Sequence, residues 1–154
     1  MATGCDPPGQ PCILIVDDDA DLVAFLFSML VEEKYSIVAA SHGQQALDLL
    51  EQGLRPHLIL IDLMLPQVSG NDVLNHIRTD PELKAIPRIV ITGTSSPRAT
   101  VADAVFEKPF DHRELLHAIQ RLVRSKDREP TAGTASRATA DDRSDVKKKR
   151  RSAK

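Results

Sequence analysis

The feature that most constrains the fold is a regular alternation of short apolar runs with longer amphipathic segments. Five runs rich in apolar and β-branched residues lie at 13–16, 36–40, 58–61, 88–92 and 104–107. Segments with helical periodicity lie at 20–33, 44–52, 72–78 and 112–124. Short strands that alternate with helices predict βαβ units and a parallel sheet. Because a run such as 58-LILI-61 carries no polar residue, the sheet should be covered on both faces.

The ends of the helices are marked by residues with known capping preferences. Asp111 can cap the last helix, Glu114 completes a capping box, and Phe110 can pack onto Leu115 as a hydrophobic staple. Gly53 is well placed to end the helix at 44–52. These signals support the helix assignments independently of their apolar periodicity.

Charge and composition change abruptly near residue 125. Residues 1–124 hold 10 Lys and Arg against 17 Asp and Glu, whereas residues 125–154 hold 10 against 5. Val146 is the only sizeable apolar side chain after Arg124, so this segment cannot bury enough surface to order itself. We therefore expect a flexible N-terminus at 1–10, one domain at 11–125 and a disordered basic tail at 126–154.

Several classes of protein are disfavoured by the sequence. No apolar run approaches the roughly 18 residues that a membrane helix needs, and the N-terminus lacks the pattern of a secretory signal. A disulfide between Cys5 and Cys12 is possible, but two cysteines this close favour reduced thiols in a cytosolic protein. We therefore expect a cytoplasmic location.

Charged and polar side chains stand at the carboxyl ends of the predicted strands. They are Asp17 and Asp18 after the first, Asp62 after the third, Thr92 and Gly93 at the fourth, and Lys108 and Pro109 after the fifth. The carboxyl ends of parallel strands meet at one edge, where such sheets bind ligands. Asp19 and Asp21 are expected only to cap and charge the first helix.

The predicted cluster indicates a magnesium site. Two carboxylates about 4 Å apart repel by roughly 4 kcal/mol at an effective dielectric constant of 20, so three of them need a counter-charge. Lys108 supplies one positive charge, and a divalent cation is the fuller answer. Ligands that are all oxygen favour Mg²⁺ over zinc. A cation, a hydroxyl and an ammonium together would stabilise a phosphoryl group, with Asp62 as the nucleophile that forms an aspartyl-phosphate.

Four motifs in this order resemble the response-regulator receiver domain of bacterial two-component systems, of the stand-alone type. They are 13-ILIVDDD-19, 59-ILIDLMLPQVSG-70, 89-IVITG-93 and 107-EKPF-110, and the resemblance covers residues 12 to about 124. It implies an α/β, flavodoxin-like, doubly wound sheet of five parallel strands in the order 2-1-3-4-5. It also implies a phosphoprotein of phosphorelay signal transduction, which is a signalling domain and not a classical enzyme, although it can promote its own phosphotransfer and dephosphorylation.

The resemblance assigns a role to each motif residue. Asp62 matches the phosphoacceptor, and Asp17 and Asp18 match the acidic pair that holds Mg²⁺. The backbone carbonyl of Met64 matches a further metal ligand. Thr92 and Lys108 match the groups that contact the phosphoryl oxygens. The remaining matches are the supporting turn residues Pro66, Gly70, Gly93 and Pro109.

Two departures from the family pattern concern signal output. Val105 stands where the family usually has an aromatic residue that reports on the threonine, and Phe106 should face the opposite side of the strand. Only fifteen residues separate Thr92 from Lys108, which leaves room for a shortened or missing fourth helix. We therefore expect output through another face of the domain or through the tail.

The resemblance implies a sensor histidine kinase or histidine phosphotransfer protein as donor, and an unknown downstream partner. We expect no intrinsic DNA-binding domain, because the remaining length is too short for one. The run 147-KKKRR-151 is either a solvated end or an electrostatic contact with nucleic acid or an anionic membrane. Two alternatives stay open: a phosphorylation-independent adaptor with the receiver fold, and a haloacid-dehalogenase-like phosphatase whose nucleophile is Asp17.

Overall fold

The computed structural model describes residues 9–93 and 102–128, except for the side chains of 126–128. The chain divides into two units, residues 1–123 and 124–154, and the candidate site lies in the first. The predicted flexible N-terminus falls largely outside the described residues, as does the predicted tail from residue 129 on.

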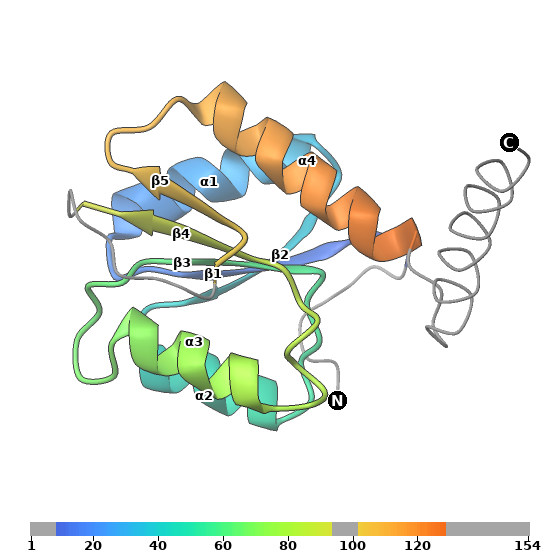
Figure 1. Ribbon diagram of the computed structural model, residues 1–154. Coiled ribbons are helices and arrows are strands. Elements are labelled where there is room, and N and C mark those ends of the chain that lie inside the picture. Colours follow the sequence, from blue (N-terminus) through green and yellow to red (C-terminus); the bar gives the residue numbers. More distant parts are fainter. Residues whose placement is uncertain (1–8, 94–101, 129–154) are drawn as a thin grey trace, which may run out of the picture. The chain divides into compact units, whose positions relative to one another are not determined.

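Five parallel strands form the sheet, in the predicted order β2-β1-β3-β4-β5 (Figure 1). The strands are β1 (Cys12–Val16), β2 (Ser36–Ala40), β3 (Leu58–Ile61), β4 (Arg88–Thr92) and β5 (Ala104–Glu107). Val16 lies opposite Ala40 on one side and Ile61 on the other, so β1, β2 and β3 end level with one another. The residues that follow these strands are therefore brought to one edge.

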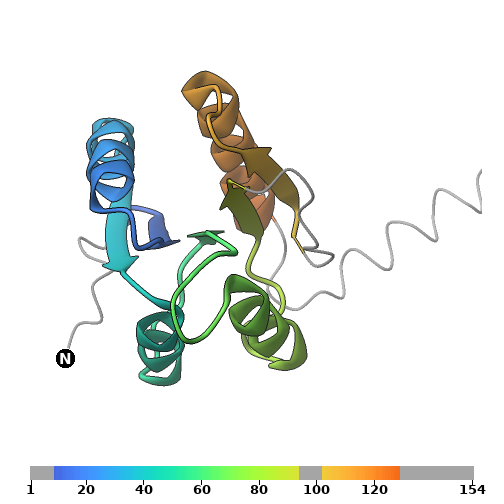
Figure 2. The same ribbon diagram turned by 90° about the vertical axis from the view of Figure 1, so that its left-hand side faces the viewer.

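Helices cover both faces of the sheet (Figures 1 and 2). One face carries α1 (Ala20–Glu32) and α4 (His112–Arg128), and the other carries α2 (Gly43–Glu51) and α3 (Gly70–Thr79). Between β4 and β5 the described residues contain no helix. The shortened or missing fourth helix was predicted for residues 93–103, and 94–101 lie outside the described residues. Within the described ranges, no helix is both long enough and apolar enough to cross a membrane.

The core has two layers because neighbouring strand residues point to opposite faces. Leu14 and Val16 pack toward α2 and α3, whereas Ile13 and Ile15 pack toward α1 and α4. All four side chains are buried, as expected for a central strand covered on both faces. Each buried aliphatic side chain of this kind contributes roughly 1.5–3 kcal/mol, so the sheet is a firm base for the residues at its edge.

The helix starts differ from the predictions because of caps that the apolar pattern does not show. α3 begins at Gly70 and not at Asp72, since Ser69 and Asp72 form a reciprocal capping box. α2 begins at Gly43, with the ring of His42 accepting a hydrogen bond from the Gln45 amide.

The predicted end of α2 and start of α4 agree with the structure. Gly53 follows Gln52, the C-cap residue of α2, and adopts a φ of 109°, which favours glycine. The Asp111 carboxylate accepts hydrogen bonds from the amides of Arg113 and Glu114, and these bonds lower the pKa of Asp111.

The expectation of reduced thiols is wrong for Cys12. This residue is fully buried at the start of β1 and is disulfide-bonded. The other cysteine of the chain, Cys5, lies outside the described residues.

Candidate functional site

Asp62 is a buried carboxylate at the end of the central strand β3, with a relative exposure of 6%. Its backbone amide donates to the carbonyl of Val16 at 3.0 Å, which continues the pairing of β1 with β3 by one residue. One carboxylate oxygen, Oδ1, accepts a hydrogen bond from the Met64 amide at 3.0 Å. The sheet and the following turn therefore fix both the position and the orientation of this carboxylate.

Asp17 and Asp18 follow β1 and complete an acidic cluster with Asp62. The Asp17 amide donates to the carbonyl of Ala40 at 3.1 Å, and its Oδ1 accepts from the Asp19 amide at 2.9 Å. Asp17 is buried, whereas Asp18 is exposed. Asp17, Asp18 and Asp62 each offer one carboxylate oxygen, and these three oxygens lie within 4.8 Å of one another.

Lys108 reaches this cluster from the end of β5. Its amide donates to the carbonyl of Thr92 at 2.8 Å, which anchors the residue to β4. Its Nζ lies 3.2 Å from Oδ2 of Asp17 and 3.1 Å from Oδ2 of Asp62. The ammonium therefore bridges two buried carboxylates, and the following Lys108–Pro109 peptide bond is cis.

The pKa directions show how these charges depend on one another. Burial raises the pKa of Asp17 and outweighs the Asp19 amide and Lys108, which both lower it. Burial by itself would lower the pKa of Lys108, but hydrogen bonds and charges from Asp62 and Asp17 raise it above its ordinary value. Lys108 is therefore held firmly protonated by the site, whereas the charge on Asp17 is costly.

The donor set fits a hard divalent cation. Three carboxylates and one ammonium leave a formal charge of −2 if all are ionised, and the oxygens are close enough to share one ion. Elsewhere in the described residues no other group of three histidine, cysteine, aspartate or glutamate side chains could hold a metal. Because every side-chain ligand is an oxygen and Asp18 is open to water, these residues fit Mg²⁺.

The loop between β3 and α3 is held against Asp62 by a glycine. A Cβ at Gly70 would lie 2.2 Å from the carbonyl oxygen of Asp62, so no other residue fits there without a shift of the backbone. The Gly70 amide also donates to the Leu63 carbonyl at 3.0 Å. Pro66 lies exposed in the same loop. By contrast, a Cβ at Gly93 would meet no atom of the described residues within 4 Å, so none of them demands glycine at that position by a close approach.

The other predicted residues lie around this centre. Thr92 ends β4 and is fully buried, and the Met64 side chain is exposed beside Asp62. The roles predicted for the Thr92 hydroxyl and the Met64 carbonyl remain predictions. Val105 is 42% exposed, whereas Phe106 packs toward α1 and α4, so the two side chains do face opposite sides of β5.

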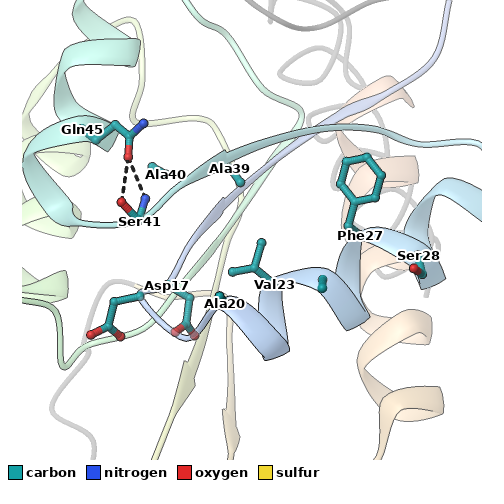
Figure 3. A pocket seen from close by; sticks show the side chains of 11 residues that line it. Asp17, Ala20, Val23, Phe27, Ser28, Ala39, Ala40, Ser41 and Gln45 are labelled. Atoms are coloured by element: carbon teal, nitrogen blue, oxygen red, sulfur yellow. Dashed lines mark hydrogen bonds between the residues drawn. The ribbon is translucent and has the colours of Figure 1, made fainter.

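Sequence reasoning missed a groove that runs from the acidic cluster along α1 (Figure 3). It has a volume of about 540 Å³ and lies between α1 and the end of β2. Asp17 and Asp18 line one end, and Val23, Phe27 and Ala39 line its apolar part. Small alanines on one face of α1 were the available signal, but an alanine-rich helix face is equally typical of close packing.

The sequence also matches a known family. The model of the response regulator receiver domain matches residues 13–120. The chain belongs to the response regulator receiver domain family. Phosphorylation and Mg²⁺ binding are typical of this family in two-component systems.

Curated relatives of this receiver domain are response regulators. The transcriptional regulatory protein CpxR of Escherichia coli is 36% identical over 118 residues, which are 73% of this chain and 49% of CpxR. The DNA-binding response regulator MtrA of Mycobacterium tuberculosis is 36% identical over 124 residues, which are 77% of this chain and 53% of MtrA. The chain thus spans about half the length of the curated relatives it matches.

Solved receiver structures share the fold. A CheY-like receiver domain protein from Methanospirillum hungatei has a TM-score of 0.72 and 27% identity, over 79% of this chain and all of that one. The response regulator TrrA of Thermotoga maritima, solved with Mg²⁺ and BeF, has a TM-score of 0.67 and 31% identity, over 73% of this chain and 99% of TrrA.

Proposed function

We propose that this receiver domain accepts a phosphoryl group on Asp62 from a phosphohistidine, with Mg²⁺, and changes its partner binding as a result. The donor is a sensor histidine kinase or a histidine phosphotransfer protein. The observation that carries the proposal is the Lys108 ammonium, which bridges Asp17 and Asp62 within 3.2 Å beside the exposed carboxylate of Asp18.

Each residue has a defined task in this proposal. Asp62 is the nucleophile: one of its carboxylate oxygens attacks phosphorus while the donor imidazole leaves. The Met64 amide donates to Oδ1 of Asp62 and leaves Oδ2 beside Lys108. Lys108 then donates to a phosphoryl oxygen, and the Thr92 hydroxyl donates to another.

Asp17, Asp18, Asp62 and the Met64 carbonyl would hold the cation. Bound Mg²⁺ neutralises charge on the phosphoryl oxygens and on the carboxylates. The residues of the chain set the remaining geometry, since Asp17 is tied to β2 through Ala40 and Asp62 is tied to β1 through Val16. Such preorganised groups need no rearrangement when negative charge develops.

We further propose that output uses the tail or a face other than the one built by β5, α4 and the segment between β4 and β5. Supporting this view, α1 carries the exposed apolar side chains Phe25, Phe27 and Val31, each 44–47% exposed. Large exposed apolar groups on one helix are typical of protein interaction surfaces.

We also propose that phosphoryl transfer to this domain takes place in the cytoplasm, where two-component donors present their phosphohistidines.

The two alternatives make different predictions about Asp62. A phosphatase of the haloacid-dehalogenase type would use Asp17 and leave Asp62 without a role, although Lys108 contacts both. An adaptor would need neither carboxylate for partner binding. The buried position of Asp62 and its ordered hydrogen bonds favour phosphoryl acceptance.

Intact mass spectrometry after incubation with a small phosphodonor and Mg²⁺ tests the proposal. We expect one added phosphate in the wild type and none in Asp62→Ala or without Mg²⁺. Asp21→Ala is the matched control, because Asp21 is an exposed aspartate near the site, and it should behave as the wild type. Phosphate that survives in Asp62→Ala but is lost in Asp17→Ala would move the nucleophile to β1.

The basic tail is a separate part of the proposal. We propose that 147-KKKRR-151 contacts nucleic acid or an anionic membrane by charge alone. Binding to DNA and to anionic vesicles should fall steeply with salt and disappear when residues 125–154 are removed. Equal binding with and without these residues would refute this contact.

A further inference from the structure

The turn between β2 and α2 contacts both segments that carry the acidic residues, the one after β1 and the one after β3. On one side, the carbonyl of Ala40 accepts the hydrogen bond from the Asp17 amide at 3.1 Å. On the other side, Gly43 packs on Val68 in the loop that follows Asp62. A Cβ at Gly43 would lie 2.3 Å from the carbonyl oxygen of Val68 and 3.0 Å from its Cβ. Backbone contacts this close leave no space for a methyl group.

The turn is itself well ordered by its own side chains. The Gln45 side-chain oxygen accepts hydrogen bonds from the amide and the hydroxyl of Ser41, at 2.8 and 3.2 Å (Figure 3). The Gln45 amide donates to Nδ1 of His42 at 3.2 Å. Gly43 is buried at the start of α2, so it cannot move away from Val68 without moving the helix.

The loop on which Gly43 packs carries Met64 and is held by two close contacts near its C-terminal end. Gly70, which follows the loop, packs against the carbonyl of Asp62. Gly43 packs against Val68, two residues before Gly70. Met64 lies earlier in the same loop, and its amide orients the Asp62 carboxylate. A displacement of Val68 must therefore be absorbed by the segment that sets the cation ligands.

We propose that Gly43 is a positioning residue for the cation site. It holds the β3–α3 loop at the distance from Asp17 and Asp18 that one divalent ion requires, and Gln45 supports it by ordering the turn. This inference rests on the proposed function, because it presupposes that the acidic cluster binds Mg²⁺. It adds a residue that touches neither the ion nor the phosphoryl group.

Thermal unfolding at increasing Mg²⁺ concentrations tests this inference without any phosphodonor. A ligand that binds only the folded state at a free concentration c raises the free energy of unfolding by RT ln(1 + c/Kd), so the dependence of the melting temperature on Mg²⁺ concentration gives the apparent Kd, which equals the half-saturating concentration. For Gly43→Ala we expect the half-saturating Mg²⁺ concentration to rise about tenfold, since the loop is pushed outward. Gln45→Ala inserts no atoms and should raise it about threefold, which keeps the test valid if Gly43→Ala does not fold.

Leu50→Ala is the control for a merely structural effect. Leu50 is a buried residue of α2 that packs in the core away from the acidic cluster, so this variant should melt earlier with an unchanged half-saturating concentration. Unchanged Mg²⁺ affinity in both turn variants would overturn the role of Gly43. A wild type that Mg²⁺ does not stabilise would overturn the proposed function itself, and the inference with it.

Discussion

Strands β3 and β5 are both four residues long and both deliver a charged residue to the site, yet their surroundings differ sharply. All four residues of β3 are buried, because the strand lies inside the sheet between α-helical layers. In β5, an edge strand, residues alternate between half-buried and exposed, and Val105 and Glu107 face outward. The same strand length thus supports two different degrees of burial.

The difference suits the two residues that these strands carry. In the proposed function Asp62 must hold one orientation as the nucleophile, and burial on both faces of β3 restricts its backbone. Lys108 follows an edge strand and its side chain is 26% exposed, against 8% for that of Asp62. Because the side chain of lysine is flexible, its ammonium can move from contact with a carboxylate to contact with a phosphoryl oxygen. We infer that the site pairs a rigid acceptor with an adaptable cation.

The largest contrast should appear in stability when each strand loses side-chain volume. Leu60→Ala in β3 leaves a cavity in the core and should lower the free energy of unfolding by about 3 kcal/mol. Val105→Ala in β5 should change it by less than about 0.5 kcal/mol, because the side chain is 42% exposed. Urea unfolding without Mg²⁺ measures both, and similar losses would contradict the contrast between the strands.

Removal of the lysine charge should have the next largest effect. Lys108→Met leaves the buried carboxylates of Asp17 and Asp62 without a cation and should cost about 2 kcal/mol without Mg²⁺. Lys84→Met, at an exposed lysine, is the matched control and should be neutral. A loss no larger than that of the control would show that the bridge does not stabilise the fold.

The pH dependence of that loss follows from the raised pKa of Lys108. A group whose pKa is higher in the folded state contributes stability below its unfolded value, here about 10.5, and loses it as pH rises through the folded value. The difference between wild type and Lys108→Met should therefore be constant from about pH 6 to 9 and shrink above about pH 10.5. Unfolding curves at several pH values would measure it.

A smaller effect of opposite sign is expected for Asp17→Asn. Burial raises the pKa of Asp17, so its charge disfavours folding at pH values above its ordinary value of 3.8. The variant should be about 1 kcal/mol more stable than the wild type at pH 7 without Mg²⁺, as is common when a functional charge is removed. The gain should vanish near pH 3, where the carboxyl is protonated in both states, and Mg²⁺ should no longer stabilise the variant. Destabilisation at pH 7 would show that the bond to Lys108 outweighs burial.

The smallest effect should come from a larger side chain on the exposed side of β5. Val105→Phe places an aromatic ring at a half-exposed position, so the free energy of unfolding should change by less than about 0.5 kcal/mol. The amount of phosphate accepted from a small phosphodonor should also be unchanged, because the residue lies outside the acidic cluster. A loss of several kcal/mol would mean that this side of β5 is covered.

The fold and the charged core of the site were predictable because their signals are local or periodic. Strand runs such as 58-LILI-61 and the carboxylates that follow them stand next to each other in the sequence. The rule that parallel strands end at one edge was then enough to bring Asp17, Asp62 and Lys108 together, and the structure places them within salt-bridge distance.

Other features depended on contacts between segments far apart in the chain. The close approach of Gly43 to Val68 and the groove along α1 have no periodic signature. The start of α3 was misplaced because Ser69 and Asp72 cap each other only once the loop has its folded shape.

The sequence by itself therefore determined which elements form and which charges meet at the edge of the sheet. Only the tertiary structure decided how closely the supporting loops approach one another and which oxygen of each carboxylate faces Lys108. The physical reason is the distance along the chain over which each effect acts. Hydrophobic periodicity is set by residues a few positions apart, whereas loop packing depends on steric contacts between segments that are far apart in the sequence.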